Sequence, residues 1–347
     1  VRNWDYRYCW LRDATFTLYS FMEAGYTEEA KAWSEWLLRA VAGDPGQLQI
    51  MYGAGGERGL PELELKHLAG YEGSKPVRIG NAASEQFQLD VYGEIMDAMH
   101  LARHVGIRTG ANSWHLQRHL VEYVEKHWME PDEGIWEIRG PRLHFTHSKV
   151  MAWVAVDRAV KAVEEFNLEG DLDRWRSLRQ KIHDDVCANG YHAGRGAFTQ
   201  SYGSEQLDAS CLMIPLVGFL PATDPRVIGT VQAIRRELMF GGLVYRYHPT
   251  ESVNVDGLPP GEGAFLPCSV WLVDCLHLMG QADDARALFN KLLGMQTPLG
   301  LLAEEYDPKY KRLVGNFPQA FSHVGLVNTA QNLSPAQLGP AEVRSVA

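Results

Sequence analysis

The sequence has no uncharged apolar run of about 18 residues, the length that a transmembrane helix requires. It also lacks the basic segment followed by an apolar one that is typical of a secretory signal. The first residue is Val1 rather than Met, which is consistent with a piece of a longer protein. We therefore predict no membrane span and no leader in this sequence.

A concentrated positive charge is missing as well. The net charge is −10, the pI is near 5.7, and the 33 lysines and arginines are scattered rather than gathered into a stripe. This balance argues against nucleic acid or an anionic membrane as a partner. A neutral small molecule fits the charge better.

Cysteine is scarce, and its spacing is uninformative. The five residues (Cys9, Cys187, Cys211, Cys268 and Cys275) are odd in number, fall mostly in apolar helical patterns and form no CxxC pair. We interpret them as buried free thiols in a reducing compartment, which predicts a cytoplasmic location. Disulfides and metal ligation by these cysteines remain the less favoured alternatives.

Several catalytic signatures are also absent. His144, His147, His248 and His323 lack HExxH spacing, so we predict no metal. The glycine-rich stretches 53–59 and 257–263 match neither a phosphate loop nor a dinucleotide fingerprint, and no GxSxG motif occurs. These absences remove most rival enzyme classes, and they leave no sign of an organic cofactor.

What the sequence does contain is helical periodicity from end to end, which predicts an all-α protein. The expected helices span 10–24, 27–42, 84–104, 111–129, 147–166, 171–188, 206–219, 224–239, 262–279, 281–294 and 317–333. Helices that are apolar on nearly all sides alternate with helices that carry a charged stripe, as 148–159 does with 171–185. Since the first kind is buried and the second faces solvent, this order predicts an (α/α) toroid of inner and outer helices. A large irregular helical bundle is the alternative.

Such a toroid closes with six pairs, whereas the pattern gives eleven helices. Either the tail supplies the twelfth, or a helix preceding Val1 is absent from this chain. We expect one catalytic domain over 1–333 and a tail over 334–347. The long non-helical segments are expected to share one rim of the toroid and to build a site there; they are 44–82, 130–146, 189–205, 240–261 and 295–316.

Two of these segments deliver carboxylates among apolar and aromatic neighbours. Glu137 follows Trp136, and burial beside an indole would raise the pKa of that carboxyl, as a general acid requires. Glu304, Glu305 and Asp307 follow an apolar run, where an ionised carboxylate could activate a water. Two carboxyls in such surroundings suit cleavage of a glycosidic bond. A rim glutamate paired with Arg139 and an acidic solvated turn are the structural alternatives.

A third constellation lies near the start of the chain. Residues 3–13 (NWDYRYCWLRD) place four aromatic rings beside the Arg12–Asp13 pair. Aromatic faces and planar charged groups recognise the CH surfaces and hydroxyls of sugars. A hydrophobic staple with a surface ion pair is the alternative interpretation.

In combination, the motifs resemble the bacterial branch of glycoside hydrolase family 15, the glucoamylase and trehalase family. The resemblance runs in order from residue 1 to about 333 and rests on NWDYRYCWLRDA, PVRIGNAA, QLDVYGE, GIWEIRG, HFTHSKVMAW, GEGAF, LLAEEYD and VGNFPQAFSH. It implies an (α/α)6 barrel, and hydrolysis of an α-glucosidic bond from the non-reducing end with inversion to β-glucose. It also implies that this chain lacks the first helix, and an N-terminal β-sandwich domain that many relatives carry.

The resemblance further implies roles for single residues. Glu137 matches the general acid and Glu304 the general base, although the adjacent Glu305 leaves the choice of base partly open. The sugar contacts that it implies are Arg12, Asp13, Tyr6, Tyr8, Trp10, Trp136, Arg78, Asn81, Arg139, Lys149, Glu262 and Glu305.

The substrate stays open between glucan ends and α,α-trehalose, because that choice depends on a neighbouring subsite formed by 44–82 and 240–261. Small substrates, trehalose or short oligosaccharides, are slightly favoured over raw starch. A catalytically silent sugar-binding toroid and a non-hydrolytic lyase or epimerase on the same barrel are the alternatives from other classes.

Overall fold

The computed structural model describes residues 2–40, 45–107, 110–248, 256–258 and 261–334. Its α-helices are α1 (Leu11–Glu23), α2 (Thr27–Ala40), α3 (Asp90–His104), α4 (Ala111–His127), α5 (Thr146–Phe166), α6 (Leu172–Asn189), α7 (Met213–Leu216), α8 (Pro225–Glu237), α9 (Leu266–Leu278), α10 (Ala282–Leu293) and α11 (Ala320–Asn332). Four 3-10 turns accompany them: η1 (Pro45–Gln47), η2 (Tyr71–Gly73), η3 (Ala82–Glu85) and η4 (Ala209–Leu212).

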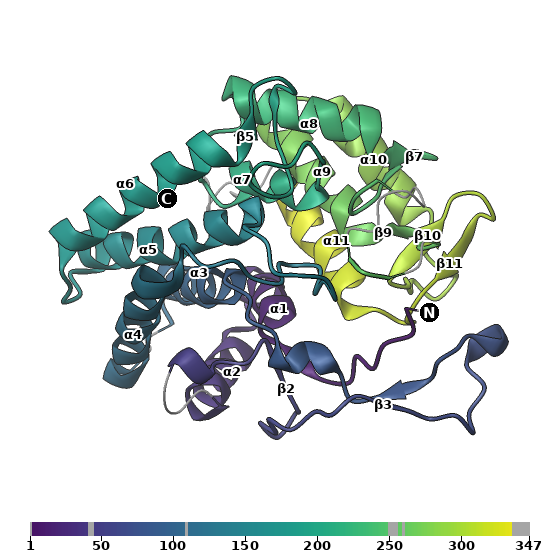
Figure 1. Cartoon of the computed structure of the whole chain (residues 1–347), viewed down its shortest axis with the longest axis horizontal. Helices are drawn as coiled ribbons and strands as arrows, with labels where there is room; N and C mark the ends of the chain where they lie inside the picture. The colour runs from purple at the N-terminus through teal and green to yellow at the C-terminus, as the bar shows by residue number, and fades with distance from the viewer. Residues whose placement is uncertain (1, 41–44, 108–109, 249–255, 259–260, 335–347) are drawn as a thin grey trace.

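The strands are only two or three residues long and all pair antiparallel, which agrees with the scarcity of alternating patterns in the sequence. They are β1 (Cys9–Trp10), β2 (Met51–Tyr52), β3 (Leu63–Glu64), β4 (Arg78–Ile79), β5 (Tyr191–His192), β6 (Ala197–Phe198), β7 (Met239–Phe240), β8 (Leu243–Val244), β9 (Ala264–Phe265), β10 (Glu305–Asp307) and β11 (Arg312–Val314). The pair β3–β4 forms an arm that extends from the helical body (Figure 1).

Six helices form a closed inner ring. Each of α1, α3, α5, α7, α9 and α11 contacts the next, and α11 contacts α1. The inner position of α9 follows from its composition, because it is apolar on all sides and every residue from Leu266 to Leu276 is buried. The amphipathic helices α2, α4, α6, α8 and α10 lie outside this ring, several of them at the periphery of the view in Figure 1. This arrangement is the predicted toroid.

Helix boundaries differ from the prediction in instructive ways. The helix expected over 206–219 is only the turn η4 followed by the single turn α7. Pro215 cannot donate a backbone hydrogen bond, and Gly218 adopts a φ of 76°, so the chain turns away there. The helix expected over 84–104 begins at Asp90, because Gln86 is extended.

Eleven α-helices occur among the described residues, as the periodicity predicts. Five of them are outer helices, one fewer than the inner ring has. Except for Ser334, the predicted tail 334–347 lies outside the described residues. A twelfth helix preceding Val1 stays a prediction.

The connections between helices alternate in length, and this alternation positions the site. Short turns such as 24–26 and 279–281 lead from an inner helix to the next outer one. The five return connections, from an outer helix to the next inner one, are all long. They therefore gather at the rim where the inner helices have their N-terminal ends. This confirms the expectation that the long segments share one rim.

The described helices and thiols bear on two further predictions. No helix in this part of the chain has the length and apolar character needed to span a bilayer. All five cysteines are free; Cys211, Cys268 and Cys275 are buried, whereas Cys9 and Cys187 are half-buried.

The close approach of α3 and α5 generates a prediction about stability. A Cβ on Gly93 of α3 would lie 2.2 Å from the carbonyl oxygen of Met151 on α5. We expect Gly93→Ala to lower the free energy of unfolding by about 1–3 kcal/mol, since the two helices would have to separate. Gly294→Ala is the control, because its Cβ would meet nothing closer than 3.5 Å. Urea denaturation that gives equal stabilities for the two variants would contradict this packing.

Candidate active site

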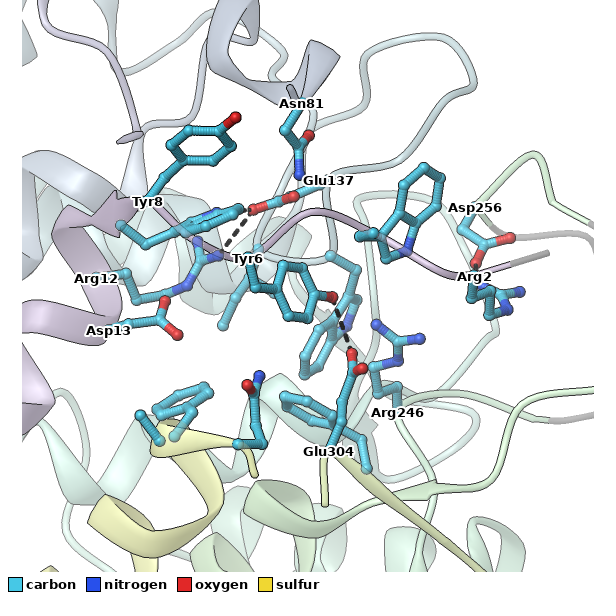
Figure 2. A pocket seen from close by; sticks show the side chains of 18 of the residues that line it. Arg2, Tyr6, Tyr8, Arg12, Asp13, Asn81, Glu137, Arg246, Asp256 and Glu304 are labelled. Atoms are coloured by element: carbon cyan, nitrogen blue, oxygen red, sulfur yellow. Dashed lines mark hydrogen bonds and ion pairs between the residues drawn. The ribbon is translucent and has the colours of Figure 1, made fainter. Parts of the chain in front are cut away.

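A cavity opens at the rim that carries the long connections (Figure 2). Its wall comes from the N-terminal segment, four of the five long connections and the first turns of inner helices. The residues that line it are Arg2, Trp4, Tyr6, Tyr8, Trp10, Arg12, Asp13, Asn81, Ile135, Trp136, Glu137, Arg139, Arg246, Asp256, Leu258, Phe265, Glu304, Gln319, Ala320 and Phe321. Segment 189–205 contributes no residue to this wall.

The structure brings most of the predicted site residues together here. Those that line the cavity are Glu137, Glu304, Tyr6, Tyr8, Trp10, Arg12, Asp13, Asn81, Trp136 and Arg139. Four others (Arg78, Lys149, Glu262 and Glu305) do not line it.

Glu137 sits on a tight turn, with its own φ at 56°. Such a left-handed conformation is costly for a residue with a side chain and is often found at functional sites. The turn is shaped by Gly134, where φ is 69° and a Cβ would lie 2.7 Å from the ring of Phe145. The backbone N–H of Glu137 donates to the Gly134 carbonyl at 3.2 Å. The local sequence therefore fixes where this carboxyl points.

The Glu137 carboxyl has two hydrogen-bond donors, and both reach the same oxygen. Trp10 Nε1 donates to Oε1 at 2.7 Å, and Arg12 Nη2 donates to it at 3.3 Å (Figure 2). Burial nevertheless raises the pKa of Glu137, against the opposing effects of Arg12 and the Trp10 hydrogen bond. A raised pKa favours the protonated form that a general acid needs. Trp10, rather than the predicted Trp136, is the indole that contacts this carboxyl.

Glu304 approaches the cavity from another side (Figure 2). Tyr6 Oη donates to Oε1 at 2.8 Å, and the backbone N–H of Asn316 donates to Oε2 at 3.2 Å. The adjacent Gly315 leaves room for this carboxylate, since a Cβ there would lie 2.9 Å from Oε2. Burial raises the pKa of Glu304, while Arg246 and these two bonds favour its ionised form. The two glutamates thus bond to different partners across one cavity.

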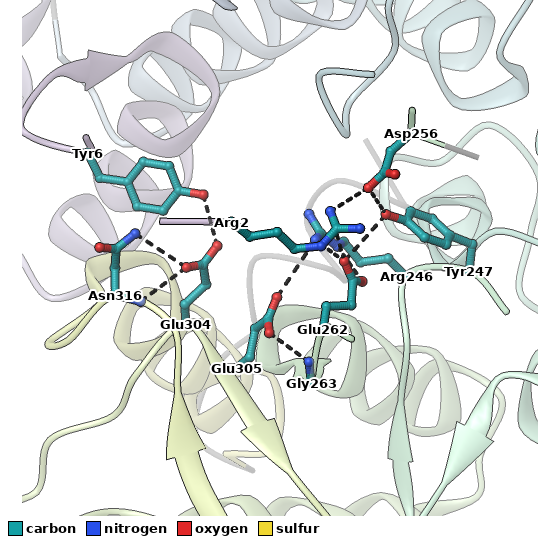
Figure 3. Close-up of polar contacts among 10 residues, drawn as sticks. All are labelled: Arg2, Tyr6, Arg246, Tyr247, Asp256, Glu262, Gly263, Glu304, Glu305 and Asn316. Atoms are coloured by element: carbon teal, nitrogen blue, oxygen red, sulfur yellow. Dashed lines mark hydrogen bonds and ion pairs between the residues drawn. The ribbon is translucent and has the colours of Figure 1, made fainter. Parts of the chain in front are cut away.

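Arg246 is the centre of an ionic cluster beside Glu304 (Figure 3). Its Nε donates to Glu262 Oε1 at 3.0 Å, and its Nη2 lies 3.7 Å from Glu305 Oε1. The guanidinium also lies 5.5 Å from the ring centre of Trp136 and 5.4 Å from that of Phe265. The carboxylates hold it in place, so a buried cation lies among several acids beside the cavity.

The same cluster extends to the beginning of the chain (Figure 3). Arg2 Nη1 pairs with Asp256 and lies 3.2 Å from Glu262 Oε2. Asp256 also accepts a hydrogen bond from Tyr247 Oη. Arg2 and Asp256 line the cavity, so they add a charged pair at its edge.

The predicted sugar contacts Arg12 and Asp13 lie at the N-terminal end of α1. Arg12 is buried and donates to Asp90 Oδ2 at 2.9 Å and to Gln88 Oε1 at 3.1 Å. Burial raises the pKa of Asp13 to about 6, although the neighbouring Arg12 favours its ionised form. Both side chains can meet sugar hydroxyls in the cavity.

The aromatic wall consists of rings packed edge to face. Tyr6 and Trp10 have centroids 5.3 Å apart at 88°, and Trp136 meets Phe265 at 5.8 Å and 84°. Trp136 Nε1 donates to both carboxylate oxygens of Asp208, at 2.9 and 3.0 Å, which fixes the indole plane. Apolar ring faces of this kind can bind the CH surface of a sugar.

The four predicted residues outside the wall need a correction. Glu262 and Glu305 act behind it: Glu262 holds Arg246, and Glu305 accepts from the backbone N–H of Gly263 at 2.7 Å. Arg78 lies 4.3 Å over the ring of Trp4, and its Nε is 3.5 Å from Glu62, the partner of Arg139. These three support lining residues rather than line the cavity themselves.

Lys149 is the fourth. It is 1% exposed, and its ammonium donates to the carbonyl oxygens of Trp128, at 2.6 Å, and Glu130. Burial lowers the pKa of Lys149 to about 8. It secures the end of α4 to α5, so we no longer propose it as a sugar contact.

Comparison with known proteins gives the family. The description "Glycosyl hydrolases family 15" matches residues 2–331. The chain belongs to glycosyl hydrolase family 15. A trehalase of Mycobacterium tuberculosis is 44% identical over 97% of this chain and 49% of its own length. A trehalase of Thermoplasma acidophilum is 36% identical over 97% of this chain and 57% of its own. The chain thus spans about half the length of these curated relatives.

Solved structures show the same fold. A glycosidase in complex with glucose matches with a TM-score of 0.72 at 19% identity, covering 94% of this chain and 88% of that one. A bacterial glucoamylase complexed with acarbose matches with a TM-score of 0.69 at 14% identity, covering 98% and 51%. These findings confirm the family-15 assignment and the (α/α)6 barrel predicted from the motifs and the helix pattern.

Several lining residues of this family-15 site were not found from the sequence, notably Arg246, Asp256, Phe265 and Phe321. Phe265 lies within the GEGAF motif and Phe321 within VGNFPQAFSH, so the motifs held a signal for both. Arg246 lies between two tyrosines in an otherwise ordinary loop. Only its carboxylate partners in the folded structure identify it as a site residue.

The crowding of acids behind the cavity predicts how stability depends on pH. Burial beside Glu262 and Glu304 raises the pKa of Glu305 from 4.5 to about 8. The contribution of this carboxyl to stability is therefore complete below about pH 4.5 and is lost as the pH rises through 8. We expect Glu305→Gln, which cannot ionise, to make the decline in unfolding free energy between about pH 5 and 9 shallower.

Urea denaturation across that pH range measures the slope. Glu28→Gln is the control, since that side chain on α2 is 85% exposed. Identical slopes in the wild-type protein and Glu305→Gln would contradict the assigned ionisation of Glu305.

Proposed function

We propose that this chain hydrolyses α,α-trehalose, with Glu137 as general acid and Glu304 as general base. The observation that carries the proposal is the pair of carboxyls on one cavity with different hydrogen-bond partners. The name trehalase, given to the relatives of 44% and 36% identity, supports the choice of substrate.

The proposed mechanism assigns one step to each carboxyl. Glu137 gives its proton to the glycosidic oxygen while the bond from that oxygen to the anomeric carbon breaks. Glu304 takes a proton from a water whose oxygen bonds to the anomeric carbon on the opposite face. The products are two glucose molecules, of which the one attacked by water is released as the β-anomer. In an inverting enzyme the carboxyls stand about 6.5–9.5 Å apart, which leaves room for this water.

The hydrogen bonds suit these two roles. Both donors to Glu137 reach Oε1, so Oε2 is the oxygen to carry the proton that is transferred. Glu304 accepts from Tyr6 and from the Asn316 backbone, and it lies near Arg246, all of which favour an ionised carboxylate. The Tyr6 hydroxyl, which bonds to Glu304, would help to hold the attacking water.

The substrate's two glucose units would occupy neighbouring parts of the cavity. Arg12, Asp13 and the ring of Trp10 would bind the terminal unit, as the family motifs imply. Asn81 and Arg139 line the part formed by the long connections, where the second unit would lie.

A glucoamylase-type activity on maltose or isomaltose is the second candidate, favoured by the structural likeness to glucoamylases. A silent sugar-binding toroid would need the aromatic wall but not the pair of carboxyls.

We also propose a cytoplasmic location, supported by five free thiols. The N-terminal β-sandwich domain and the need for no metal or cofactor stay predictions.

Removal of either carboxyl tests the proposed roles. We expect Glu137→Gln and Glu304→Gln each to lower kcat for trehalose by about 10²–10⁴-fold, the usual contribution of a general acid or base. Glu28→Gln, on the outer face of α2, should retain full activity. Assays on trehalose, maltose, isomaltose and maltotriose, with melting temperatures measured in parallel, separate chemistry from folding. Folded variants with unchanged kcat would rule out these roles, and preference for maltose would favour the glucoamylase alternative.

The Trp10 hydrogen bond predicts a change in the pH profile. This bond favours the ionised form of Glu137, so Trp10→Phe should raise the pKa of the acid. Because activity falls when the acid loses its proton, the alkaline limb of kcat/KM should move to higher pH.

Trp136→Phe is the matched control. It removes an indole from the same cavity, but that indole donates to Asp208 and not to Glu137. We expect lower activity and an unmoved alkaline limb. A limb that moves equally in both variants would contradict the specific effect of Trp10.

A further inference from the structure

A cluster of three metal-ligating side chains lies away from the cavity, where α3 and α5 end. His100 and His104 stand one helical turn apart on α3, and Glu165 is the penultimate residue of α5. At 1.5 Å of rise per residue, the two histidines lie about 15 and 21 Å along α3 from Asp90, which bonds Arg12 at the cavity. The cluster is thus on the opposite rim from the candidate active site.

The distances between the three ligating atoms match the spacing around a small metal ion. His100 Nε2 lies 3.1 Å from His104 Nε2, which lies 3.2 Å from Glu165 Oε2. Two ligands bound tetrahedrally to zinc at about 2.0–2.1 Å are about 3.3 Å apart. All three atoms lie within 4.8 Å of one another, which is compact enough for one ion to contact all of them.

Protons satisfy this arrangement poorly. A neutral imidazole nitrogen either carries one hydrogen or offers one lone pair. If His104 Nε2 carries the hydrogen, His100 and Glu165 must share it. If His100 donates instead, the lone pair of His104 faces a carboxylate oxygen at 3.2 Å. A cation between the three atoms would satisfy all of them at once.

The surroundings allow a cation to enter. His100 is 4% exposed, whereas the His104 and Glu165 side chains are 34% and 35% exposed, so the cluster is anchored on one side and open to solvent on the other. Phe166 packs its ring against both imidazoles, with centroids 6.1 and 5.1 Å away. The nearby cations Arg158 and Lys161 are paired with Asp97 and Asp157.

We propose that His100, His104 and Glu165 form a zinc site that fastens the C-terminal end of α3 to that of α5. Two imidazoles and one carboxylate are a ligand set that suits Zn²⁺, with a water in the fourth position. The bound ion would stabilise the barrel without taking part in the chemistry of the cavity.

A second histidine pair provides an internal control. His115 and His119 on α4 have the same spacing, and their Nε2 atoms are 2.9 Å apart. There, however, Glu122 meets the other ring nitrogen of His119, Nδ1, at 3.3 Å. The three ligating atoms cannot converge on one ion, so the geometry predicts no site.

The test uses the protein stripped of metal with a chelator and titrated with Zn²⁺ by calorimetry, and with Co²⁺ by visible absorption. We expect one equivalent to bind, a tetrahedral Co²⁺ spectrum and a higher melting temperature with Zn²⁺. His104→Ala and Glu165→Gln should each weaken binding by about tenfold or more and reduce the thermal shift. His119→Ala should change neither, and trehalose hydrolysis should be unaffected in all three variants.

Two outcomes would overturn the proposal. One is the absence of stoichiometric binding to the wild-type protein. The other is equal loss of binding in His104→Ala and His119→Ala, which would indicate surface histidines only. Because the Glu165 side chain is 35% exposed, Glu165→Gln keeps the test valid even if His104→Ala does not fold.

Discussion

The structure depends above all on the alternation of short and long connections around the barrel. Each outer helix returns to the next inner helix through a long connection, so all inner helices begin at one rim. The N-terminal end of a helix carries partial positive charge and free N–H groups, which suits a site rich in carboxylates. The described connections at the opposite rim are shorter, such as the turns 24–26 and 279–281. One topological rule thus places residues from distant parts of the chain around a single cavity.

Electrostatic pairing then gives the two carboxyls in that cavity different charged neighbours. Arg12 is held by Asp90 and reaches Glu137, whereas Arg246 is held by Glu262 and lies near Glu304. Each arginine is fixed by an acid behind the wall, so its position does not depend on substrate. Burial raises the pKa of both glutamates, and the local donors decide how far each remains ionisable. The acids behind the wall are therefore as important to the site as those that line it.

The sequence predicted the fold because helices buried on all sides and helices with a charged stripe differ in composition. It failed over 206–219, where an apolar run resembles a buried helix but Pro215 and Gly218 limit it to short turns. Some helix starts were also placed too early, as at α9, because Phe265 is extended while apolar. Apolar character indicates that a residue is buried. Where a helix begins is indicated only by residues with particular backbone preferences.

For the candidate site, dense aromatic and charged motifs pointed to residues that the structure places on one cavity, such as Trp10 and Glu137. Lys149 was misjudged because a charged residue in an apolar helix resembles a functional one, although its ammonium bonds to backbone carbonyls. Arg246 was missed for the opposite reason, since its partners Glu262 and Glu305 are distant in sequence. Such long-range pairs can be seen only after folding.

The most direct test of the central claim is the anomeric form of the first glucose released from trehalose, followed by ¹H NMR before mutarotation equilibrates the products. An acid and a base that act across a water from opposite faces predict equal initial amounts of β-glucose and α-glucose, since only one of the two units is inverted. Initial release of α-glucose alone would show retention, and would contradict the roles given to Glu137 and Glu304.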